Sequence, residues 1–338
     1  MCPLCGGPAP FELHDSAPDG LLALLRKLSP PGTFAAGELL NRRVSCTRCR
    51  FVFLCPRLDA PSLSIVYSAW YGYGYREIFD DPAHVAERER IFRDYHLALL
   101  AAHARFGGSL LDVGCGSGIF LNLARRAGWN KVVGIEFERS AAEFARSAYG
   151  LDVRHGSPAD QIGESEYFDV ITMFDYLEHS PEPGRELDRV VAHLAAGGVL
   201  AIRLPNQGAW LSRLKGPSWY NVISNHLGYF DAPVLRDALT RRGLRVEYAS
   251  APNFDSWPAI FARRLRWLRA RLGRARAARL PEPADVSGAV AGTSTTGESG
   301  LGSRMAKLLE DIVVEQIDHI AGLFGRGSNL FVVARRIR

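Results

Sequence analysis

Apolar residues fall in short runs along the middle of the chain, and stretches with a different spacing separate them. Residues 119–127, for example, place apolar side chains three and four positions apart, as an amphipathic helix does. Short buried runs that alternate with helices predict an α/β fold with a largely parallel sheet. The expected strands are residues 110–112, 131–136, 151–156, 168–173 and 198–203, followed by residues 244–249 and 329–335.

The turn after the first run is rich in glycine. The run ends in Asp112, and Gly114, Gly116 and Gly118 follow at alternate positions. Backbone N–H groups in such a turn can approach a ligand closely because no Cβ intervenes. The spacing is G-x-G-x-G after an acid, rather than the G-x-G-x-x-G of dinucleotide sites. An acid at the end of the strand suits a cationic ligand better than a pyrophosphate, so a nucleoside with a positive charge is the expected ligand.

This pattern resembles motif I of the class I S-adenosylmethionine (SAM) methyltransferases. The phrase D-x-L-E-H at residues 175–179 follows the fourth run, and Pro205-Asn206 follows the fifth. Both are similar to the branch that includes the ubiquinone-pathway O-methyltransferases, and the resemblance covers residues 109–250. It implies a Rossmann-like seven-stranded methyltransferase sheet whose last two strands form an antiparallel hairpin at the edge.

The resemblance and the strand ends together assign a cofactor site. In the family, the acid matching Asp112 lies near the sulfonium amino acid, and the glycines accommodate the nucleoside. Glu136 ends the second strand, where a carboxylate can accept hydrogen bonds from both ribose hydroxyls. Ser157 stands where the family has an acid that meets the adenine amino group, which leaves backbone groups or Asp160 for that contact. The expected SAM-binding residues are Asp112, Gly114, Gly116, Glu136, Ser157 and Phe174.

Methyl transfer to an alcohol requires alignment of donor and acceptor and removal of a proton. His179 is the first candidate base, since it follows the fourth strand at the sheet edge where α/β proteins bind ligands. His226 is the second, because relatives with H-L-x-x-F place this residue near the acceptor. Asp175 is expected to touch the SAM amino group or to orient His179, and Glu178 either does the same or favours the dipole of a local helix. Ordinary local hydrogen bonding would also account for His179.

Four cysteines near the N-terminus form two C-x-x-C pairs, Cys2 with Cys5 and Cys46 with Cys49. Two such pairs can complete a tetrahedral thiolate site, so we expect one structural Zn²⁺ with no open position. Disulfides and unrelated core cysteines are the alternatives. A four-cysteine module before a SAM domain resembles bacterial methyltransferases of carbohydrate and natural-product pathways, and also one group of ribosomal-RNA guanine methyltransferases.

The chain has 338 residues, 47% of them hydrophobic, which is enough for a large core and more than one ordinary α/β domain. No run suits a transmembrane helix, and the N-terminus lacks the pattern of a signal peptide. Unpaired thiols fit a reducing compartment, so a cytoplasmic location is expected.

The net charge of +5 comes from one segment, because residues 259–280 hold eight arginines and no acid. This placement argues against nucleic acid as a partner of the catalytic domain. For the segment itself, an interfacial membrane helix, an RNA-binding face and a solvated helix face remain open. The first would place the protein at the inner face of the membrane.

These observations divide the chain into five parts. A zinc-binding module covers residues 1–60, and an aromatic lid with a linker helix covers residues 61–108. The SAM-binding core covers residues 109–252. Residues 253–328 hold an Arg-rich helix, a Pro- and Ser-rich linker and an amphipathic helix, as an insertion before the final core strand at residues 329–338.

The predicted function is SAM-dependent O-methylation of a carbohydrate, a lipid-linked glycan or a secondary metabolite. The alternatives are a ribosomal-RNA base methyltransferase, a sugar C-methyltransferase and a SAM-binding scaffold without catalysis. Against the RNA alternative, Phe174-Asp175-Tyr176-Leu177 stands where an N-P-P-[FY] tetrapeptide would support amino-group methylation. The acceptor and the oligomeric state are not predicted.

Overall fold

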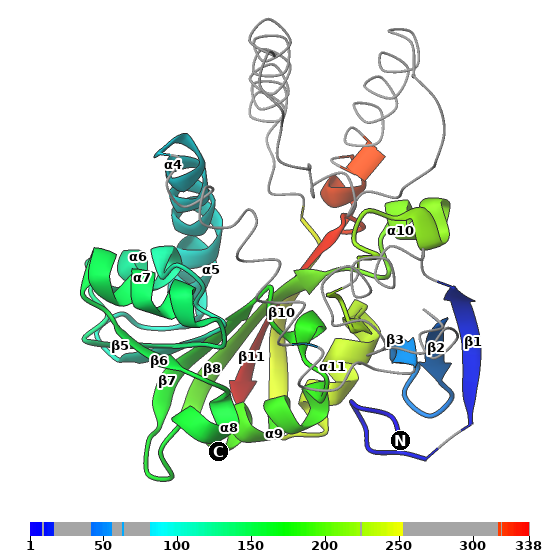
Figure 1. Cartoon of the computed structure of the whole chain (residues 1–338), viewed down its shortest axis with the longest axis horizontal. Helices are drawn as coiled ribbons and strands as arrows, with labels where there is room; N and C mark the ends of the chain where they lie inside the picture. Colours follow the sequence, from blue (N-terminus) through cyan, green and yellow to red (C-terminus); the bar gives the residue numbers. More distant parts are fainter. Residues whose placement is uncertain are drawn as a thin grey trace, which may run out of the picture.

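A seven-stranded sheet forms the centre of the protein in the computed structural model (Figure 1). The structure describes residues 1–8, 10–16, 42–55, 63, 82–223, 225–252, 317–318 and 320–337. Its strands are β4 (Ser109–Val113), β5 (Lys131–Glu136), β6 (Asp152–His155), β7 (Phe168–Phe174), β8 (Leu194–Pro205), β10 (Leu244–Ser250) and β11 (Asn329–Arg336). Six of the seven lie within one or two residues of the prediction. β8 begins earlier because Leu194 already pairs with Phe168 of β7, ahead of a register shift that leads to the pair of Val170 with Val199.

The strand order is β10-β11-β8-β7-β4-β5-β6. The strands β4 to β8 run parallel, whereas β11 runs antiparallel to both β8 and β10, so the predicted edge hairpin is confirmed. The chain runs outward from β4 to β6 and then returns to place β7 on the other side of β4. Ligands of open α/β sheets bind at the carboxyl ends of the strands at such a reversal. The Gly-rich turn therefore lies at the expected place.

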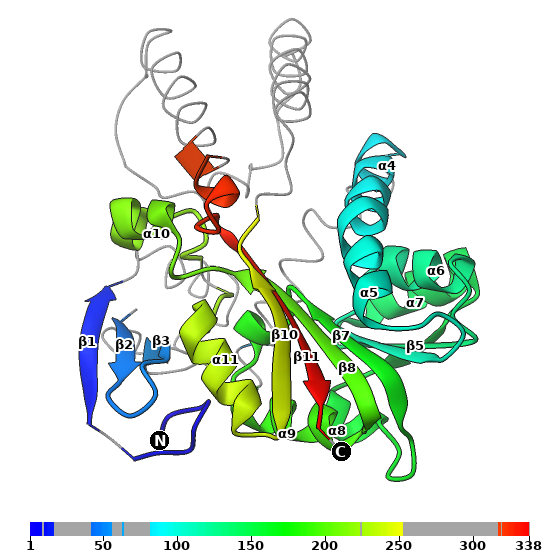
Figure 2. The ribbon, with the colours of Figure 1, turned by 180° about the vertical axis from the view of Figure 1, so that it is seen from behind.

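Helices cover both faces of this sheet (Figures 1 and 2). One face carries α4 (Pro82–Ile91), the π-helical turn η2 (Phe92–Leu97), α5 (Ala98–His103), α6 (Ile119–Arg126) and α7 (Arg139–Tyr149). The other carries α9 (Pro183–Ala192) and α11 (Ala232–Thr240), while α8 (Pro158–Gln161) and α10 (Trp210–Lys215) are short. The helix predicted at residues 119–127 is confirmed by α6, and the linker helix expected within residues 61–108 is formed by α4, η2 and α5, with the π-helical turn inside it.

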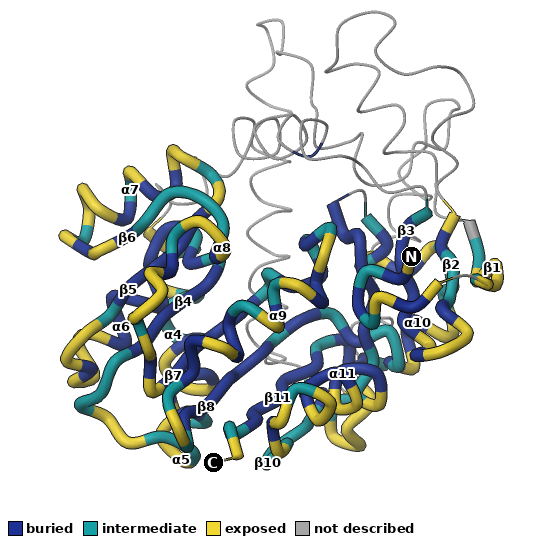
Figure 3. Tube along the Cα trace, turned by 90° about the horizontal axis from the view of Figure 1, so that it is seen from below, coloured by how far each residue is buried: buried dark blue, intermediate teal, exposed yellow. Residues whose placement is uncertain are grey.

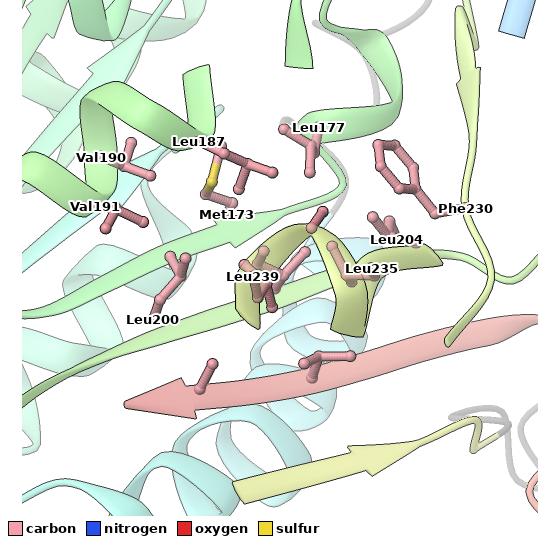
Figure 4. Packing of buried hydrophobic residues seen from close by; sticks show 14 of the residues in the cluster. Met173, Leu177, Leu187, Val190, Val191, Leu200, Leu204, Phe230, Leu235 and Leu239 are labelled. Atoms are coloured by element: carbon pink, nitrogen blue, oxygen red, sulfur yellow. The ribbon is translucent and has the colours of Figure 1, made fainter. Parts of the chain in front are cut away.

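Alternation along the strands builds two apolar layers, one on each face of the sheet. Met173 and Leu200 face α9 and α11, where they pack with Leu187 and Leu235 (Figure 4). Their chain neighbours, such as Val199, face the layer under α6 and α7. Burial is therefore continuous over residues 170–174 of β7 and 198–202 of β8, whereas the helices are buried on one side only (Figure 3). Strands buried on both faces read as the near-continuous apolar runs seen in the sequence.

A second, four-stranded sheet has the order β1-β2-β3-β9. It contains β1 (Phe11–Ser16), β2 (Arg42–Cys46), β3 (Val52–Cys55) and the two-residue strand β9 (Gly228–Tyr229). β9 comes from the loop before α11, so a segment of the methyltransferase core completes the sheet of the N-terminal module. Phe53 pairs with Gly228, and Leu54 N–H donates to the carbonyl of Leu227 over 3.0 Å. Backbone pairing thus joins the two parts of the chain.

Several predictions lie outside the described residues: the aromatic lid expected before residue 82, the Arg-rich helix at residues 259–280, the Pro- and Ser-rich linker after it, and most of the amphipathic helix before β11. At the end of the last of these, Ile320 and Phe324 are exposed, whereas Ala321 is buried. Among the described residues, no helix is long and apolar enough to cross a membrane. Short turns η3 (Leu177–His179) and η4 (Gly216–Ser218) complete the described elements.

Candidate active site

The Gly-rich turn leaves β4 with its backbone folded tightly against β5. Gly114, Gly116 and Gly118 all adopt positive φ, at 76°, 53° and 78°, in the left-handed region that glycine tolerates best. At Gly118 a Cβ would lie 2.8 Å from the Cβ of Ala145, so this glycine also allows α6 and α7 to approach. Gly114 and Gly116 instead border the carboxyl edge of the sheet.

Asp112 is 3% exposed at the end of β4. Its Oδ1 accepts a 2.6 Å hydrogen bond from the hydroxyl of Thr172, which comes from the adjacent strand β7. Burial raises the pKa of Asp112 to about 7, the bond from Thr172 opposes this, and the nearby charge of Glu136 adds to it. A buried acid with one hydroxyl donor has the capacity to pair with a cation.

Glu136 ends β5 and is 5% exposed. Its Oε2 accepts from Gly116 N–H and its Oε1 accepts from Glu138 N–H, each over 2.8 Å. An ionised carboxylate offers about four acceptor positions, so Glu136 can also accept from a further donor, such as a ribose hydroxyl. Burial raises the pKa of Glu136, while hydrogen bonds from the backbone of Glu138, Gly116 and Phe137 oppose that rise. The carboxylate is held in place from both sides before any ligand arrives.

The two other predicted cofactor residues lie differently. The Ser157 hydroxyl donates to Asp160 Oδ2 over 2.6 Å, so both polar groups considered for the adenine lie together after β6. The ring of Phe174 is 7% exposed and packs against His96, Phe120 and Phe331. The Phe174 side chain therefore belongs to the core, and its backbone is the part left for a ligand.

The segment after β7 lies directly on the Gly-rich turn. A Cβ at Gly114 would lie 2.6 Å from Cδ2 of Tyr176. Asp175, just before this tyrosine, has a positive φ of 52°, a conformation in which a non-glycine residue is strained. Its carboxylate pairs with Arg203 at 2.8 Å, and Arg203 N–H groups also reach His96 Nε2 at 3.2 Å. The backbone bend at Asp175 directs the following residues toward the Gly-rich turn.

Glu178, His179 and His226 meet at this edge. Their ligand atoms all lie within 4.8 Å of one another, and the two imidazole rings are 4.7 Å apart in an edge-to-face arrangement. Nδ1 of His179 lies 2.8 Å from the carbonyl of Asn225, and Nδ1 of His226 lies 2.8 Å from that of Asn221. A carbonyl only accepts, so each Nδ1 carries the proton and each Nε2 keeps its lone pair. Burial lowers the pKa of both imidazoles and raises that of Glu178.

Asp175 lies near this cluster, and its charge raises the pKa of His179 against the effect of burial. Its ion pair in the structure is with Arg203, and the carbonyl of Asn225 orients His179. Glu178 is 2% exposed, so it is not a solvated acid at a helix start. Its Oε1 lies 3.9 Å from His179 Nε2.

The four N-terminal cysteines also converge. Cys2 Sγ lies 3.7 Å from Cys49 Sγ, and Cys5 Sγ lies 3.9 Å from Cys46 Sγ, with no disulfide among them. Four sulfurs about 2.3 Å from one tetrahedral Zn²⁺ would lie about 3.8 Å apart. The observed spacing fits such an ion.

The two cysteine turns have the same backbone geometry. Gly6 N–H donates to the carbonyl of Cys2 over 3.0 Å, and Arg50 N–H donates to that of Cys46 over 2.7 Å. Gly6 has a φ of 66° and Arg50 one of 62°. The first turn thus has glycine at the left-handed position, whereas the second has an arginine there.

The first cysteine turn packs on the start of α9. Gly184 N–H donates to the carbonyl of Pro3 over 3.0 Å, and a Cβ at Gly184 would lie 2.5 Å from the carbonyl oxygen of Leu4. The guanidinium of Arg242 bonds Gly184 and Asp188 on α9, at 3.0 and 2.7 Å. The module is therefore seated on the methyltransferase core through backbone contacts.

Sequence reasoning assigned no role to Thr172, Arg203, His96 or Asn225. Thr172 and Arg203 are polar positions inside otherwise apolar strands, and that interruption of the pattern was the signal available. Asn225 orients His179 through its backbone carbonyl, a group that every residue has, so its side chain gave no signal. His96 lies in a helix that sequence analysis treated as a linker.

Comparison with known proteins gives consistent results. A family model described as "Methyltransferase domain" matches residues 84–249. A ubiquinone biosynthesis O-methyltransferase from Actinobacillus pleuropneumoniae is 36% identical over 109 residues, 29% of this chain and 46% of that protein. A ribosomal protein L11 methyltransferase from Burkholderia lata is 43% identical over 108 residues, 28% of this chain and 33% of that protein. The chain therefore spans less than half the length of these curated relatives.

Among solved structures, a complex of the Haloferax volcanii Trm112 methyltransferase activator with a putative methyltransferase aligns with a TM-score of 0.51 and 15% identity. The alignment covers 80% of this chain and 98% of the matched chain, and it supports the fold alone. The strand order, the Gly-rich turn between two buried acids and the family match lead to one conclusion. Residues 84–249 of this chain form a methyltransferase domain of the class I, SAM-dependent family.

Proposed function

We propose that the protein transfers the methyl group of SAM to a hydroxyl of a carbohydrate, a lipid-linked glycan or a secondary metabolite. One observation carries the proposal: the segment that holds His179 packs on the turn between Asp112 and Glu136, through the contact of Tyr176 with Gly114. The cofactor residues and the candidate base thus share one edge of the sheet. The relatives named for O-methylation in ubiquinone biosynthesis support transfer to oxygen.

The residues divide the work as follows. Asp112 faces the cationic amino-acid part of SAM, and Glu136 accepts from the ribose hydroxyls with the lone pairs that its backbone donors leave. SAM supplies a methyl group on a sulfonium, which is a good leaving group. His179 accepts the acceptor's proton at Nε2, because its Nδ1 proton is engaged by the carbonyl of Asn225. His226, buried beside it, binds the acceptor.

A structural Zn²⁺ on Cys2, Cys5, Cys46 and Cys49 completes the proposal. All four positions would be thiolates, so the ion would have no open site and would take no part in the chemistry. Its effect on the active site would be indirect, since β3 of the same module pairs with β9, next to His226. Elemental analysis should give about one Zn²⁺ per chain from these residues, and Cys46→Ser should lower that content together with the thermal stability.

The acceptor class can be found directly. Incubation with methyl-labelled SAM and cell extract, followed by separation of glycan, lipid and RNA, should place the label in glycan, lipid or small molecules. Label in RNA would favour the ribosomal-RNA alternative instead. SAM binding without any transfer would indicate a binding scaffold.

The role of His179 is tested with a matched histidine. His179→Ala should leave the SAM dissociation constant nearly unchanged, while turnover falls by about two to four powers of ten. His103 ends α5, and its carbonyl accepts from Arg335, which also donates to the carbonyl of Gly197 near the start of β8, at the opposite end of the strand from the candidate site. His103→Ala should therefore leave turnover unchanged. If His179→Ala kept normal turnover and His226→Ala lost it, His226 would be the base and His179 would bind the acceptor.

A further inference from the structure

A buried arginine joins the N-terminal module to the methyltransferase core. Arg43 lies on β2 and is 1% exposed. Its guanidinium donates to both carboxylate oxygens of Asp15 and to Oε1 of Gln207, the latter over 3.4 Å. It also lies over the ring of Tyr229, 4.7 Å from the centroid. Asp15 belongs to β1 of the module, whereas Gln207 follows β8 and Tyr229 lies in β9, so one side chain contacts both parts of the protein.

The guanidinium contacts both ends of one segment of the core, residues 207–229. This segment leaves β8 at Gln207 and reaches the sheet of the module at Tyr229. Its ends already lie together, since Gln207 N–H donates to the carbonyl of Phe230 over 2.7 Å. Arg43 adds a hydrogen bond at one end and a cation–π contact at the other. A planar guanidinium has five N–H donors, so it can bind a carboxylate and an amide oxygen at the same time.

The same segment carries the groups that orient the two candidate active-site histidines. Its backbone carbonyl at Asn225 lies 2.8 Å from Nδ1 of His179, and its carbonyl at Asn221 lies 2.8 Å from Nδ1 of His226. These bonds keep the proton on each Nδ1 and leave each Nε2 available. His226 itself belongs to the segment. The position of one imidazole and the tautomer of both therefore depend on how this segment is held.

The module also contacts the segment through its backbone. Leu54 N–H on β3 donates to the carbonyl of Leu227 over 3.0 Å, and Phe53 pairs with Gly228. The short turn η4 of the segment lies next to β1. If the side chain of Arg43 were removed, this backbone pairing would remain while the side-chain contacts at both ends of the segment would be lost. The segment would stay attached to the module, but its orientation would be less well defined.

The burial of Arg43 supports a role in geometry. Removing a guanidinium from water is unfavourable unless the charge is paired and hydrogen-bonded. The carboxylate of Asp15 balances this charge within the module. That pair alone would not require the guanidinium to reach the core, yet it also contacts Gln207 and Tyr229. Buried ion pairs add little net stability, so a role in fixing the segment accounts for these contacts better than a role in stability does.

We infer that Arg43 is a positioning residue for methyl transfer, because it fixes the segment whose carbonyls orient His179 and His226. The contacts stand on their own geometry, while their role in catalysis rests on the proposed function. The N-terminal module thus acts on the acceptor side of the active site, and the two acids that face SAM lie outside its reach. A displacement of about 1 Å at a reacting group can lower turnover by about a hundredfold, so a loosely held segment is enough to slow the reaction.

Nuclear magnetic resonance of the full chain with isotope-labelled histidine measures this orientation without SAM or acceptor. Long-range proton–nitrogen spectra distinguish an imidazole protonated at Nδ1 from one protonated at Nε2. The signals of His179 and His226 are identified by their loss in His179→Gln and His226→Gln. We expect the Nδ1-protonated form for both in the natural sequence. In Arg43→Met and in Gln207→Ala the His226 signals should move toward those of a mixture of the two tautomers, because the accepting carbonyl is no longer fixed.

The matched control is Arg42→Met, since Arg42 is an exposed arginine on the same strand. It should leave the histidine signals as they are in the natural sequence. Thermal unfolding and calorimetry with S-adenosylhomocysteine show whether each variant keeps its fold and its cofactor site. Methyl transfer from labelled SAM to cell extract should fall by about tenfold to a hundredfold in Arg43→Met, with S-adenosylhomocysteine affinity nearly unchanged. The fall should be smaller in Gln207→Ala, which keeps the ion pair with Asp15.

Unchanged histidine signals in both Arg43→Met and Gln207→Ala would overturn the inference, and so would altered signals with full methyl transfer. A loss of S-adenosylhomocysteine affinity as large as the loss of transfer would also overturn it, because a general loosening of the core would then explain both. If Arg43→Met does not fold, Gln207→Ala decides. If the natural sequence transfers no methyl group to any fraction of the extract, the proposed function fails, and the histidine spectra still decide whether Arg43 positions the segment.

Discussion

Asp112 offers a measurable conflict between stability and cofactor binding. The carboxyl group is buried, and burial raises its pKa from 3.8 to about 7. Below pH 3.8 the acid is neutral in both the folded and the unfolded chain. Between pH 3.8 and 7 the folded state retains the proton that the unfolded state has lost, so stability falls as the pH rises through this window. The empty protein should therefore unfold more easily at about pH 8 than at about pH 5.

The size of the effect follows from the two pKa values. Each factor of ten in proton affinity corresponds to about 1.4 kcal/mol, so ionised Asp112 destabilises the empty fold by about 4 kcal/mol at about pH 8. The amide introduced by Asp112→Asn would resemble the neutral acid, and its oxygen could keep the bond from Thr172. Its new N–H groups lack a designed acceptor, which costs about 1–2 kcal/mol. The net expectation for Asp112→Asn is a gain of about 2–3 kcal/mol at about pH 8 and a loss of about 1–2 kcal/mol at about pH 4.

Denaturant unfolding of the empty protein at both pH values measures this difference, provided that the transition is two-state. Asp152→Asn is the matched control, because Asp152 is 58% exposed on β6. It should change the unfolding free energy by no more than about 0.5 kcal/mol at either pH. Calorimetry should show weaker SAM binding in Asp112→Asn, since the cation loses its carboxylate. If Asp112→Asn lost the same amount of stability at about pH 8 as at about pH 4, the argument that the ionised Asp112 destabilises the empty protein would be refuted.

Three other substitutions probe particular contacts. Glu136→Ala should weaken SAM binding, measured by calorimetry, by about 1.5–3 kcal/mol, because it removes charge-assisted bonds to the ribose. The control Glu143→Ala, at an exposed position on α7, should keep the natural affinity, and equal affinity in both variants would contradict ribose binding by Glu136. Gly184→Ala should destabilise the protein by about 1–3 kcal/mol and lower its Zn²⁺ content, because its Cβ would meet the Leu4 carbonyl at 2.5 Å. Gly163→Ala, whose Cβ would meet only the flexible Glu166 at 3.4 Å, is the control in thermal unfolding. Arg50→Gly should raise the free energy of unfolding by about 0.5–1 kcal/mol, because it relieves a positive φ of 62°. Arg48→Gly, in the same turn, is the control, and an equal loss of stability in both variants would show that the φ of Arg50 carries no strain.

The local sequence was sufficient to predict the order of the strands and the Gly-rich turn between Asp112 and Glu136. Short apolar runs ending in Asp112 and Glu136 gave strands, because burial on both faces of a parallel sheet requires such runs. The Gly-rich turn and the paired cysteines could also be recognised in the sequence, because left-handed backbone turns and C-x-x-C turns depend on residues that are neighbours in the chain. The predicted edge hairpin came from the family pattern, and the pairing of β10 with β11 confirms it.

Only the tertiary structure brought together residues that are distant in the chain. His226 is separated from His179 by the helices α9 and α10 and the strand β8, and it meets His179 because β9 leaves the core to complete the sheet of the N-terminal module. The pairing of Asp175 with Arg203 and the burial of the Phe174 ring arise where two neighbouring strands and a helix pack together. A periodic pattern states which face of an element is buried, but it carries no information on which partner covers that face. The partners here are set by strand order and backbone pairing, and these emerge when the whole chain packs around one core.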